Sequence, residues 1–202
     1  MKLRSEIKQQ AKKNFAAQYW ISVGAFVLYM LIVSFASEML VGAIFLVPPM
    51  IVGYYSFTLK VYRGEQGDIG DMFSVGFSNY WRNVGGILWM QLFTFLWTLL
   101  FIVPGLIKAL AYFMTPYLLA DTKDVRPTQA LKLSMRMTKG HKGKIFVTYL
   151  SFIGWAILTA LTFGILAIFY TGPYFETSLA GLYSELKQNA LDNGVVTEQE
   201  LA

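Results

Sequence analysis

The chain has 202 residues, of which 55% are hydrophobic and only 14% are charged. Average soluble domains carry about 25% charged residues, so this composition excludes a disordered chain, a coiled coil, collagen and an ordinary water-soluble enzyme. The net charge is +5, and the absence of cysteine excludes disulfides, thiolate metal sites and a cysteine nucleophile. The class that remains is an integral membrane protein, and the expected fold is all-α and polytopic.

Six apolar segments approach the roughly 20 residues that a helix needs to cross a bilayer. They are 20–36, 39–59, 84–103, 104–120, 145–161 and 163–183. Short turns at Ser37–Glu38, Val103–Gly105 and Thr162–Gly164 group them into three hairpins. Pro104 and Gly105 favour a turn over one long helix through the third and fourth segments. The sequence therefore predicts six transmembrane helices.

The basic residues predict the orientation of these hairpins. Sixteen of the seventeen lie before, between or after the hairpins, and only Lys108 falls elsewhere. Basic loops remain in the cytoplasm, so we expect a bacterial plasma-membrane protein with both termini cytoplasmic. Ser34-Phe35-Ala36 resembles a signal-peptide cleavage site, but the long segment before the apolar run favours a retained first span.

A cytoplasmic amphipathic helix is expected before each hairpin. In the first unit the apolar stripe is Leu3, Ile7, Ala11 and Phe15. In the second unit, the residues at helical spacing are Ile69, Met72, Phe73, Gly76, Phe77 and Tyr80. The third helix is expected between Pro127 and Gly140, with one polar stripe. We expect the second and third of these helices to lie in the inner headgroup region, and the alternative is a helix packed on the cytoplasmic ends of the spans.

These elements recur with a period of about 62 residues. The predicted units are residues 1–62, 63–124 and 125–186, which together form one membrane domain with a pseudo-threefold repeat. Residues 187–202 are expected to form a flexible cytoplasmic tail. The expected contacts with anionic lipid are Lys132, Arg136, Lys139, Lys142 and Lys144.

Several stretches of the sequence are similar to one bacterial family. They are Gly53-Tyr-Tyr-Ser-Phe, residues 68–73 with 76–77, residues 103–112, residues 114–121, residues 130–142 and Gly172-Pro-Tyr. The chain resembles the integral membrane proteins grouped as domain of unknown function 975. That family also looks related to the membrane domain of some bacterial glycerophosphodiester phosphodiesterases, in which the phosphodiesterase is a separate soluble domain. The resemblance implies a multi-span membrane protein and no established activity.

The sequence contains few groups that are suited to catalysis. His141 lies among lysines, which disfavours a metal role and favours a helix-capping one. The cytoplasmic acids are Glu65, Asp68, Asp71, Asp121 and Asp124. Three of them lie at expected helix starts, where the helix dipole favours an anion, and basic residues surround the others. We therefore expect no enzymatic activity, no cofactor and no metal, although paired acids would suit a membrane-embedded lipid enzyme.

Glu176 is the clearest candidate site because ionisable residues inside membrane spans are rare and usually functional. Gln91 lies at a similar depth, and we hypothesise a hydrogen bond between the two. Tyr112 and Lys108 are alternative partners of Glu176. The carboxylate either holds the spans together or serves as a proton or substrate site.

The leading hypothesis is a non-enzymatic plasma-membrane protein that acts on the bilayer or on a membrane partner. Envelope stress, peptide immunity and assistance to export are the expected settings. The expected partners are anionic lipids, and a membrane protein or a second copy of the chain, but no nucleic acid. The alternative is a small transporter or channel subunit with a polar site around Glu176.

Overall fold

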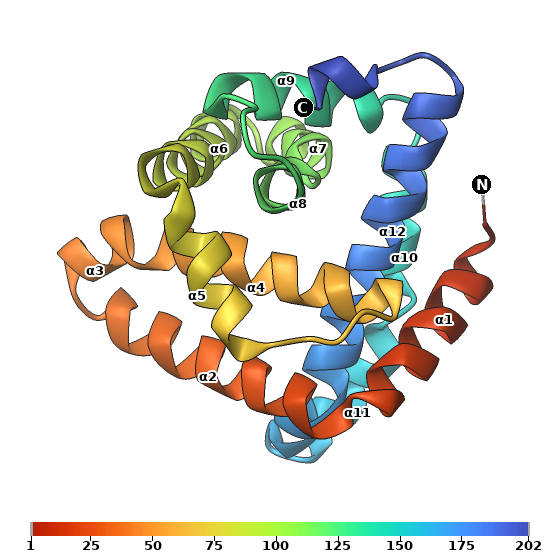
Figure 1. The fold of residues 1–202 in the computed structure, drawn as a ribbon. Helices are drawn as coiled ribbons and strands as arrows, with labels where there is room; N and C mark the ends of the chain where they lie inside the picture. Colours follow the sequence, from red (N-terminus) through yellow and green to blue (C-terminus); the bar gives the residue numbers. More distant parts are fainter. Residues whose placement is uncertain (1, 202) are drawn as a thin grey trace.

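The computed structural model describes residues 2–201, and throughout this range the chain forms helices joined by short turns, with no strand (Figure 1). The helices are α1 (Arg4–Ala17), α2 (Tyr19–Ser37), α3 (Leu40–Phe45), α4 (Val47–Arg63), α5 (Ile69–Ser78), α6 (Tyr80–Leu100), α7 (Ile102–Tyr112), α8 (Thr115–Asp121), α9 (Pro127–Met137), α10 (Lys142–Leu150), α11 (Ile153–Leu161), η1 (Ala167–Thr171), α12 (Gly172–Asp192) and η2 (Glu198–Glu200). The all-helical prediction is confirmed for these residues.

Four helical stretches are long and apolar enough to cross a membrane. They are Tyr19–Ser37, Tyr80–Leu100, Ile102–Asp121 and Lys142–Leu161. These stretches match the first, third, fourth and fifth predicted spans, so the chain has the helices of a membrane protein. The break between the third and fourth spans falls at Phe101, and Pro104 lies in the first turn of α7, where proline is tolerated.

The second and sixth predicted spans are not confirmed. The second is divided at Leu46 into α3 and α4. The sixth begins with two residues of positive φ, Phe163 and Gly164, followed by the π-helical turn η1 and then α12. Both α4 and α12 are largely covered by other helices, so their side chains suit protein contacts more than lipid contacts.

Helix α4 forms the centre of the molecule. The helices α2, α8 and α12 all pack against it, and α4 contributes the fully buried side chains Tyr54, Phe57 and Leu59. Two further large side chains, Tyr117 of α8 and Tyr183 of α12, are also buried. The interior is therefore filled by aromatic and aliphatic side chains from all three predicted units.

Each helix that precedes a predicted hairpin packs against other helices along one face. Helix α5 packs on α4, α9 packs on α6 and α8, and α1 packs on α12 and α4. The α4–α5 contact requires glycine, because a Cβ on Gly53 would lie 1.8 Å from the Met72 carbonyl oxygen. At Gly76 a Cβ would lie 2.5 Å from the Pro49 oxygen. One face of each helix therefore contacts protein, while Phe73 and Phe77 of the predicted apolar stripe of α5 are each 38% exposed.

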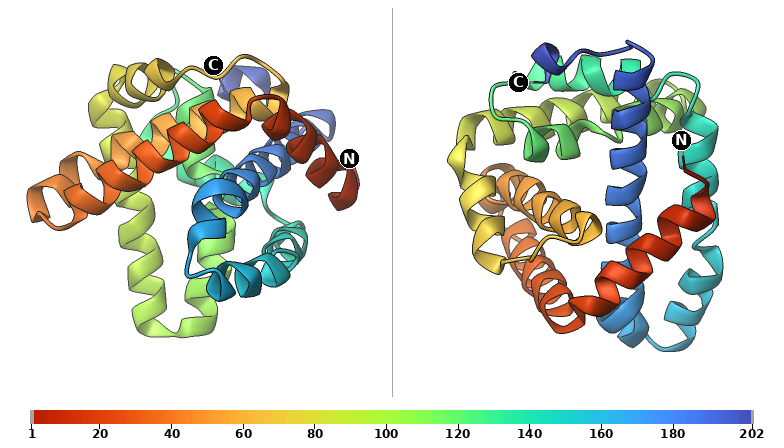
Figure 2. Two further views of the ribbon diagram at one scale, coloured as in Figure 1. Left: turned by 90° about the horizontal axis from the view of Figure 1, so that it is seen from below. Right: turned by 45° about the vertical axis from the view of Figure 1, so that its right-hand side comes forward.

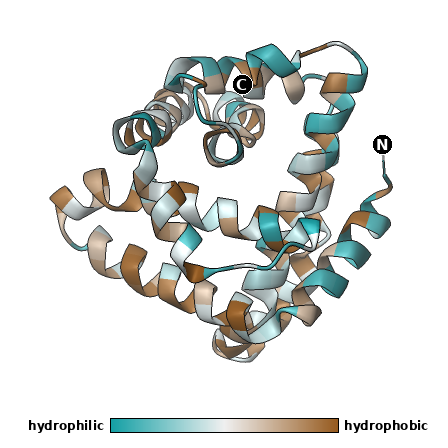
Figure 3. Cartoon of the chain, in the orientation of Figure 1, coloured by the Kyte–Doolittle hydropathy of each residue, from teal (hydrophilic) through white to brown (hydrophobic). Residues whose placement is uncertain are grey.

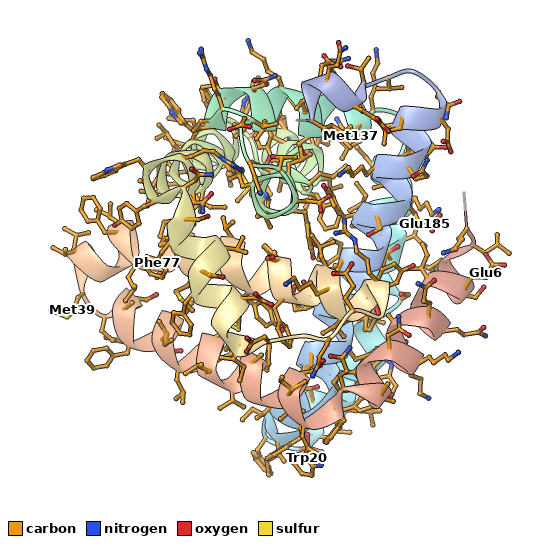
Figure 4. All side chains as sticks on the ribbon, viewed as in Figure 1. Glu6, Trp20, Met39, Phe77, Met137 and Glu185 are labelled. Atoms are coloured by element: carbon orange, nitrogen blue, oxygen red, sulfur yellow. The ribbon has the colours of Figure 1, made fainter. Side chains whose placement is uncertain are left out.

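The antiparallel pair α6 and α7 runs nearly along the line of sight in Figure 1, whereas α4 crosses the view and α12 runs along its height (Figures 1 and 2). Apolar residues beside three of the breaks between helices are exposed. Leu40 is 77% exposed, Ile102 is 79% exposed and Phe163 is 97% exposed. Apolar residues cover α2 and α3, and hydrophilic residues dominate α1 (Figure 3). Met39 lies at one extremity of the molecule, far from Glu185 (Figure 4).

The C-terminal segment differs from the flexible tail expected from residue 187. Helix α12 continues to Asp192, and the short helix η2 follows. Val196 and Leu201 are buried in the main apolar core. Arg136 of α9 pairs with Glu200 at 2.6 Å. Two buried apolar side chains and one ion pair therefore dock this segment on α9. The acidic composition of the segment did not predict this docking.

Candidate functional site

Glu176 lies in the first half of α12, just after the helix begins at Gly172 and Pro173. Its side chain is half-buried, but the Oε2 atom is fully buried and has no hydrogen-bond partner among the described residues. No lysine, arginine or histidine in residues 2–201 forms an ion pair with it. A buried carboxylate without a partner is costly, so this atom is the strongest anomaly in the interior.

Five tyrosines lie in the region of Glu176, and we call them the tyrosine cage. Each tyrosine hydroxyl lies within Coulombic range of the Glu176 carboxylate. They are Tyr29 of α2, Tyr54 and Tyr55 of α4, Tyr117 of α8 and Tyr149 of α10. The cage thus draws on all three predicted units.

The rings of the cage pack on one another. Tyr29 and Tyr54 stack with ring centroids 4.3 Å apart, and Tyr55 and Tyr117 lie 4.4 Å apart. The Tyr117 hydroxyl is buried and, like Glu176 Oε2, has no hydrogen-bond partner in the described part of the chain. The site therefore combines aromatic faces with two unsatisfied polar groups.

A groove of about 460 Å³ reaches the edge of this cage. Tyr55 and Tyr149 belong to both the groove and the cage. The other side chains that line the groove come mainly from α6 and α7, and they include Gln91, Thr94, Tyr112 and Phe113. Glu176 itself does not line the groove.

The structure brings together only part of the predicted polar site. Gln91 and Tyr112 line the same groove, but the described residues contain no hydrogen bond from Gln91 to Glu176. The Lys108 Nζ lies 4.9 Å from the ring centroid of Trp97 and 5.9 Å from that of Tyr112. Lys108 thus makes cation–π contacts instead of pairing with the carboxylate.

Comparison with protein families gives one match. The family described as "Protein of unknown function (DUF975)" matches residues 87–190, slightly more than half of the chain. The chain belongs to this family. Comparisons with curated proteins and with solved structures gave no match.

The DUF975 match includes Glu176 and two of the cage tyrosines, Tyr117 and Tyr149. It also covers the predicted site residues Gln91, Lys108 and Tyr112, whereas Tyr29, Tyr54 and Tyr55 lie before it. The cage is therefore completed by the part of the chain that precedes the matched segment.

The five basic residues predicted to contact anionic lipid all lie within the DUF975 segment, on and after α9. Lys132, Arg136 and Lys139 are exposed, whereas Lys142 and Lys144 are half-buried. Arg136 also donates to the Val195 carbonyl, and the Lys144 ammonium donates to the Lys2 carbonyl at 3.0 Å. Hydrogen bonds from Arg136 hold the pKa of the Glu200 carboxyl below its ordinary value. Lys132 and Lys139 are thus the more available basic side chains of this surface.

The acids considered for catalysis lie in separate contacts. Asp68 caps the start of α5 by accepting from the Gly70 N–H, and Asp71 pairs with Lys60 at 2.6 Å. Asp121 accepts from Arg63 at 2.7 Å and from Lys187 at 2.5 Å. The Tyr183 hydroxyl also donates to Asp121, at 3.0 Å. We call these last four residues the Asp121 cluster, which joins the ends of α4 and α8 to α12.

Sequence reasoning missed both the tyrosine cage and the Asp121 cluster in this DUF975 chain. One signal was present, because Tyr55 and Tyr117 are separated by the predicted period of 62 residues, and Arg63 and Lys187 by twice that number. Equivalent positions in a cyclic repeat lie at similar distances from a common axis. Aromatic and charged residues at matching positions could therefore have predicted these contacts.

Proposed function

We propose that the chain is a non-enzymatic protein of the bacterial plasma membrane that acts on the bilayer, either directly or through a membrane partner. The observation that carries this proposal is the combination of a filled centre with exposed apolar ends on the outer helices. Large exposed apolar surfaces mark membrane or protein contacts. Leu40, Ile102 and Phe163 are the most informative examples, since each lies beside a break between helices.

Six membrane crossings in three hairpins remain our preferred arrangement. Two contacts separated by the repeat period support it. Gly76 of α5 lies against the Pro49 carbonyl, and 62 residues later Thr138 donates to the Ala111 carbonyl at 3.2 Å. The packing of α1 on α12 would close the cycle of three units. On this account α4 and α12 cross the membrane inside the protein and need fewer apolar residues.

The orientation follows from charge. Both termini and the long basic loops face the cytoplasm, and the apolar turns face outward. In this arrangement Lys132 and Lys139 contact anionic headgroups, with each cation contributing about 1 kcal/mol. A second copy of the chain or another membrane protein is the proposed partner, and nucleic acid is not.

Helices that are inclined to the membrane normal would thin the bilayer around the protein. A helix rises about 1.5 Å per residue, so one that is strongly inclined to the membrane normal covers less than the full apolar thickness. The surrounding lipids adjust by local thinning. We propose that this deformation underlies a role in envelope stress, peptide immunity or export. Similarity to the membrane domain of glycerophosphodiester phosphodiesterases belongs to the same proposal, with the shared feature being the membrane scaffold and not hydrolysis.

The test is a deletion strain challenged with membrane-active cationic peptides and with detergents that perturb the envelope. We expect the deletion strain to be more sensitive than the wild type. The wild-type gene should restore resistance, whereas Ile102→Asp, which places a charge at an apolar turn, should not. Restoration by Lys123→Gln is the matched control, because Lys123 lies in a polar loop. Unchanged sensitivity of the deletion strain to every agent would contradict an action on the bilayer.

A second candidate function is a small transporter or channel subunit. The fully buried, unpartnered oxygen of Glu176 specifically favours it, because polar groups of this kind mark pathways in membrane proteins. The filled centre favours the first proposal. Proton or ion flux into vesicles reconstituted with the chain distinguishes them, since only the transporter predicts flux that Glu176→Gln abolishes.

A further inference from the structure

Three basic side chains gather where the start of α1 contacts α10, and we call them the basic triad (Figure 2). Arg4 and Lys8 lie one turn apart on α1, and Lys144 lies in the first turn of α10. The Arg4 guanidinium donates to the Val147 carbonyl at 3.4 Å, and the Lys8 ammonium donates to the Ser151 carbonyl at 3.3 Å. The contact between the two helices therefore concentrates positive charge at one place.

No member of the basic triad forms an ion pair within residues 2–201. Glu185 of α12 lies within Coulombic range of Lys144, but it already pairs with Lys2 at 3.2 Å. Glu6 accepts from the Leu3 N–H at the start of α1. Because like charges one helical turn apart repel each other, an anion that bridges the triad would stabilise this contact.

Two hollows lie beside the triad. A polar hollow of about 340 Å³ is lined by Leu3, Arg4, Ser5, Lys144 and Val147. A second hollow of about 500 Å³ lies between α10 and α11 on one side and η1 with the start of α12 on the other, and we call it the lateral groove. Most of the side chains that line it are apolar, among them Leu150, Ile153, Ala156, Ala167 and Phe175. The lateral groove therefore has the lining and the size to hold an apolar chain.

Phe152 connects the basic triad with the lateral groove. Its side chain lines the groove, and the Lys8 Nζ lies 4.0 Å from the centroid of its ring. Val147 lines the polar hollow, and Leu150, three residues further along α10, lines the lateral groove. Residues at this spacing are neighbours on one face of a helix. A molecule with its chain in the groove would thus have its polar end at the triad.

The position on the chain selects the ligand. The lateral groove lies along Lys142–Leu161, one of the four stretches long and apolar enough to cross a membrane, and Lys144 lies at the end that we assign to the cytoplasmic face. An occupant of both hollows needs an apolar chain joined to an anionic group. An anionic phospholipid of the inner leaflet has both. A soluble anion lacks the chain, and a zwitterionic lipid lacks the net charge.

We propose that the basic triad and the lateral groove bind one anionic glycerophospholipid of the inner leaflet, with its phosphate in the polar hollow and an acyl chain in the groove. This inference deepens the proposed contact with anionic headgroups and rests on the proposed membrane insertion. It differs from the surface contacts of Lys132 and Lys139 because a single lipid molecule occupies a defined place.

The experiment uses the purified full chain in a detergent with a neutral headgroup, titrated with phosphatidylglycerol and followed by native mass spectrometry, which counts bound lipid molecules. We expect one molecule to bind roughly tenfold more tightly than phosphatidylcholine with the same acyl chains. Glycerol 3-phosphate, which has the phosphate but no acyl chain, should not displace it. Equal binding of the two lipids, displacement by glycerol 3-phosphate, or formation of a dimer in place of lipid binding would each overturn the proposal.

Charge variants test the triad. Lys8→Gln combined with Lys144→Gln should weaken binding of phosphatidylglycerol roughly tenfold and leave binding of phosphatidylcholine nearly unchanged. Lys13→Gln combined with Lys123→Gln removes the same charge at two exposed positions outside both hollows and should bind like the wild type. Equal weakening by the two pairs would show a general effect of net charge and contradict a defined site.

Size variants test the lateral groove. Ala156→Trp fills the groove, whereas Ala160→Trp places the same side chain at an exposed position of α11 that does not line it. Only Ala156→Trp should weaken binding, and it should do so several-fold for both lipids. Equal binding by these variants would overturn the role of the groove. If the paired lysine variant fails to fold, the comparison of the two lipids and these exposed positions decide.

The measurement contains neither a bilayer nor cells, which separates it from the test of the proposed function. Absence of a tight lipid would refute the site and leave the deletion strain to decide on an action on the bilayer. Unchanged sensitivity of that strain would refute the action on the bilayer and leave the lipid site to stand on its own binding data.

Discussion

Tyr55 of α4 and Tyr117 of α8 pack against each other with ring centroids 4.4 Å apart, although 62 residues separate them in the chain. Tyr183 of α12 stacks on Tyr117 at 5.1 Å. These three rings join the inner helices of the three predicted units. Buried aromatic pairs contribute about 0.5–1.5 kcal/mol beyond the area that they bury, so these contacts add to the stability of the centre.

The Tyr117 hydroxyl gives the first prediction. It is buried without a hydrogen-bond partner among the described residues, so Tyr117→Phe should leave stability unchanged or raise it by about 1 kcal/mol. Tyr183→Phe is the matched change, because it removes a hydrogen bond to Asp121 and should destabilise by about 1 kcal/mol. Denaturation by sodium dodecyl sulfate in micelles, followed by circular dichroism, measures both. Equal destabilisation by the two variants would contradict this difference.

Removal of the Asp121 carboxylate should destabilise the whole chain. Its side chain is only 10% exposed, and Asp121→Ala leaves Arg63 and Lys187 without their shared anion. The expected loss is about 2–3 kcal/mol in the free energy of unfolding. Asp192→Ala, at an exposed position near the end of α12, is the control and should change stability by less than about 0.5 kcal/mol. Similar losses in both variants would argue against a special role for the Asp121 cluster.

Two glycines should respond in opposite ways to substitution. Gly53→Ala places a methyl group against the Met72 backbone, so α4 and α5 must separate, and we expect a loss of about 3 kcal/mol or more. Gly24→Ala lies in open space within α2 and should be neutral or stabilising by up to about 1 kcal/mol. The same denaturation measurement applies. A tolerated Gly53→Ala would mean that α5 does not pack on α4 as described.

Docking of the C-terminal segment should depend on pH. Because Arg136 lowers the pKa of Glu200 in the docked state, this contribution is complete above the ordinary glutamate pKa of about 4.5 and is lost as pH falls through the lowered value. Hydrogen exchange of the amides in residues 195–201 should therefore remain slow at neutral pH and accelerate, relative to intrinsic rates, only below about pH 4.5. Glu200→Gln should accelerate this exchange at neutral pH, whereas Glu198→Gln should not. Fast exchange in the wild type at neutral pH would contradict docking.

Local patterns in the sequence predicted much of the helical order. The lengths of the apolar segments predicted α2 and α6, and Asp68 and Pro127 indicated the starts of α5 and α9. The predicted turn at Thr162–Gly164 contains two residues with positive φ angles. Local patterns did not predict the division at Leu46. The helix that begins at Val47 is largely buried by other helices, and this long-range packing is not visible in the local sequence.

The candidate site was only partly predictable for a related reason. Glu176 could be predicted from its own segment, because an ionisable residue inside an apolar stretch is unusual. Its neighbours come from α2, α4, α8 and α10, and only long-range packing determines which side chains reach it. Gln91 lies on α6, but the position of a residue along its helix does not by itself fix the direction in which its side chain points.

The most direct test of three apolar hairpins inserted from a basic cytoplasmic side is cysteine labelling in intact cells, which the natural absence of cysteine makes clean. Single cysteines at Glu38, Phe101 and Thr162 probe the three turns, and one at Lys139 probes the opposite side. With a membrane-impermeant maleimide, we predict labelling of the three turn positions in intact cells, and labelling of position 139 only after permeabilisation. Labelling of position 139 from outside, or protection of any turn until permeabilisation, would contradict the proposed insertion.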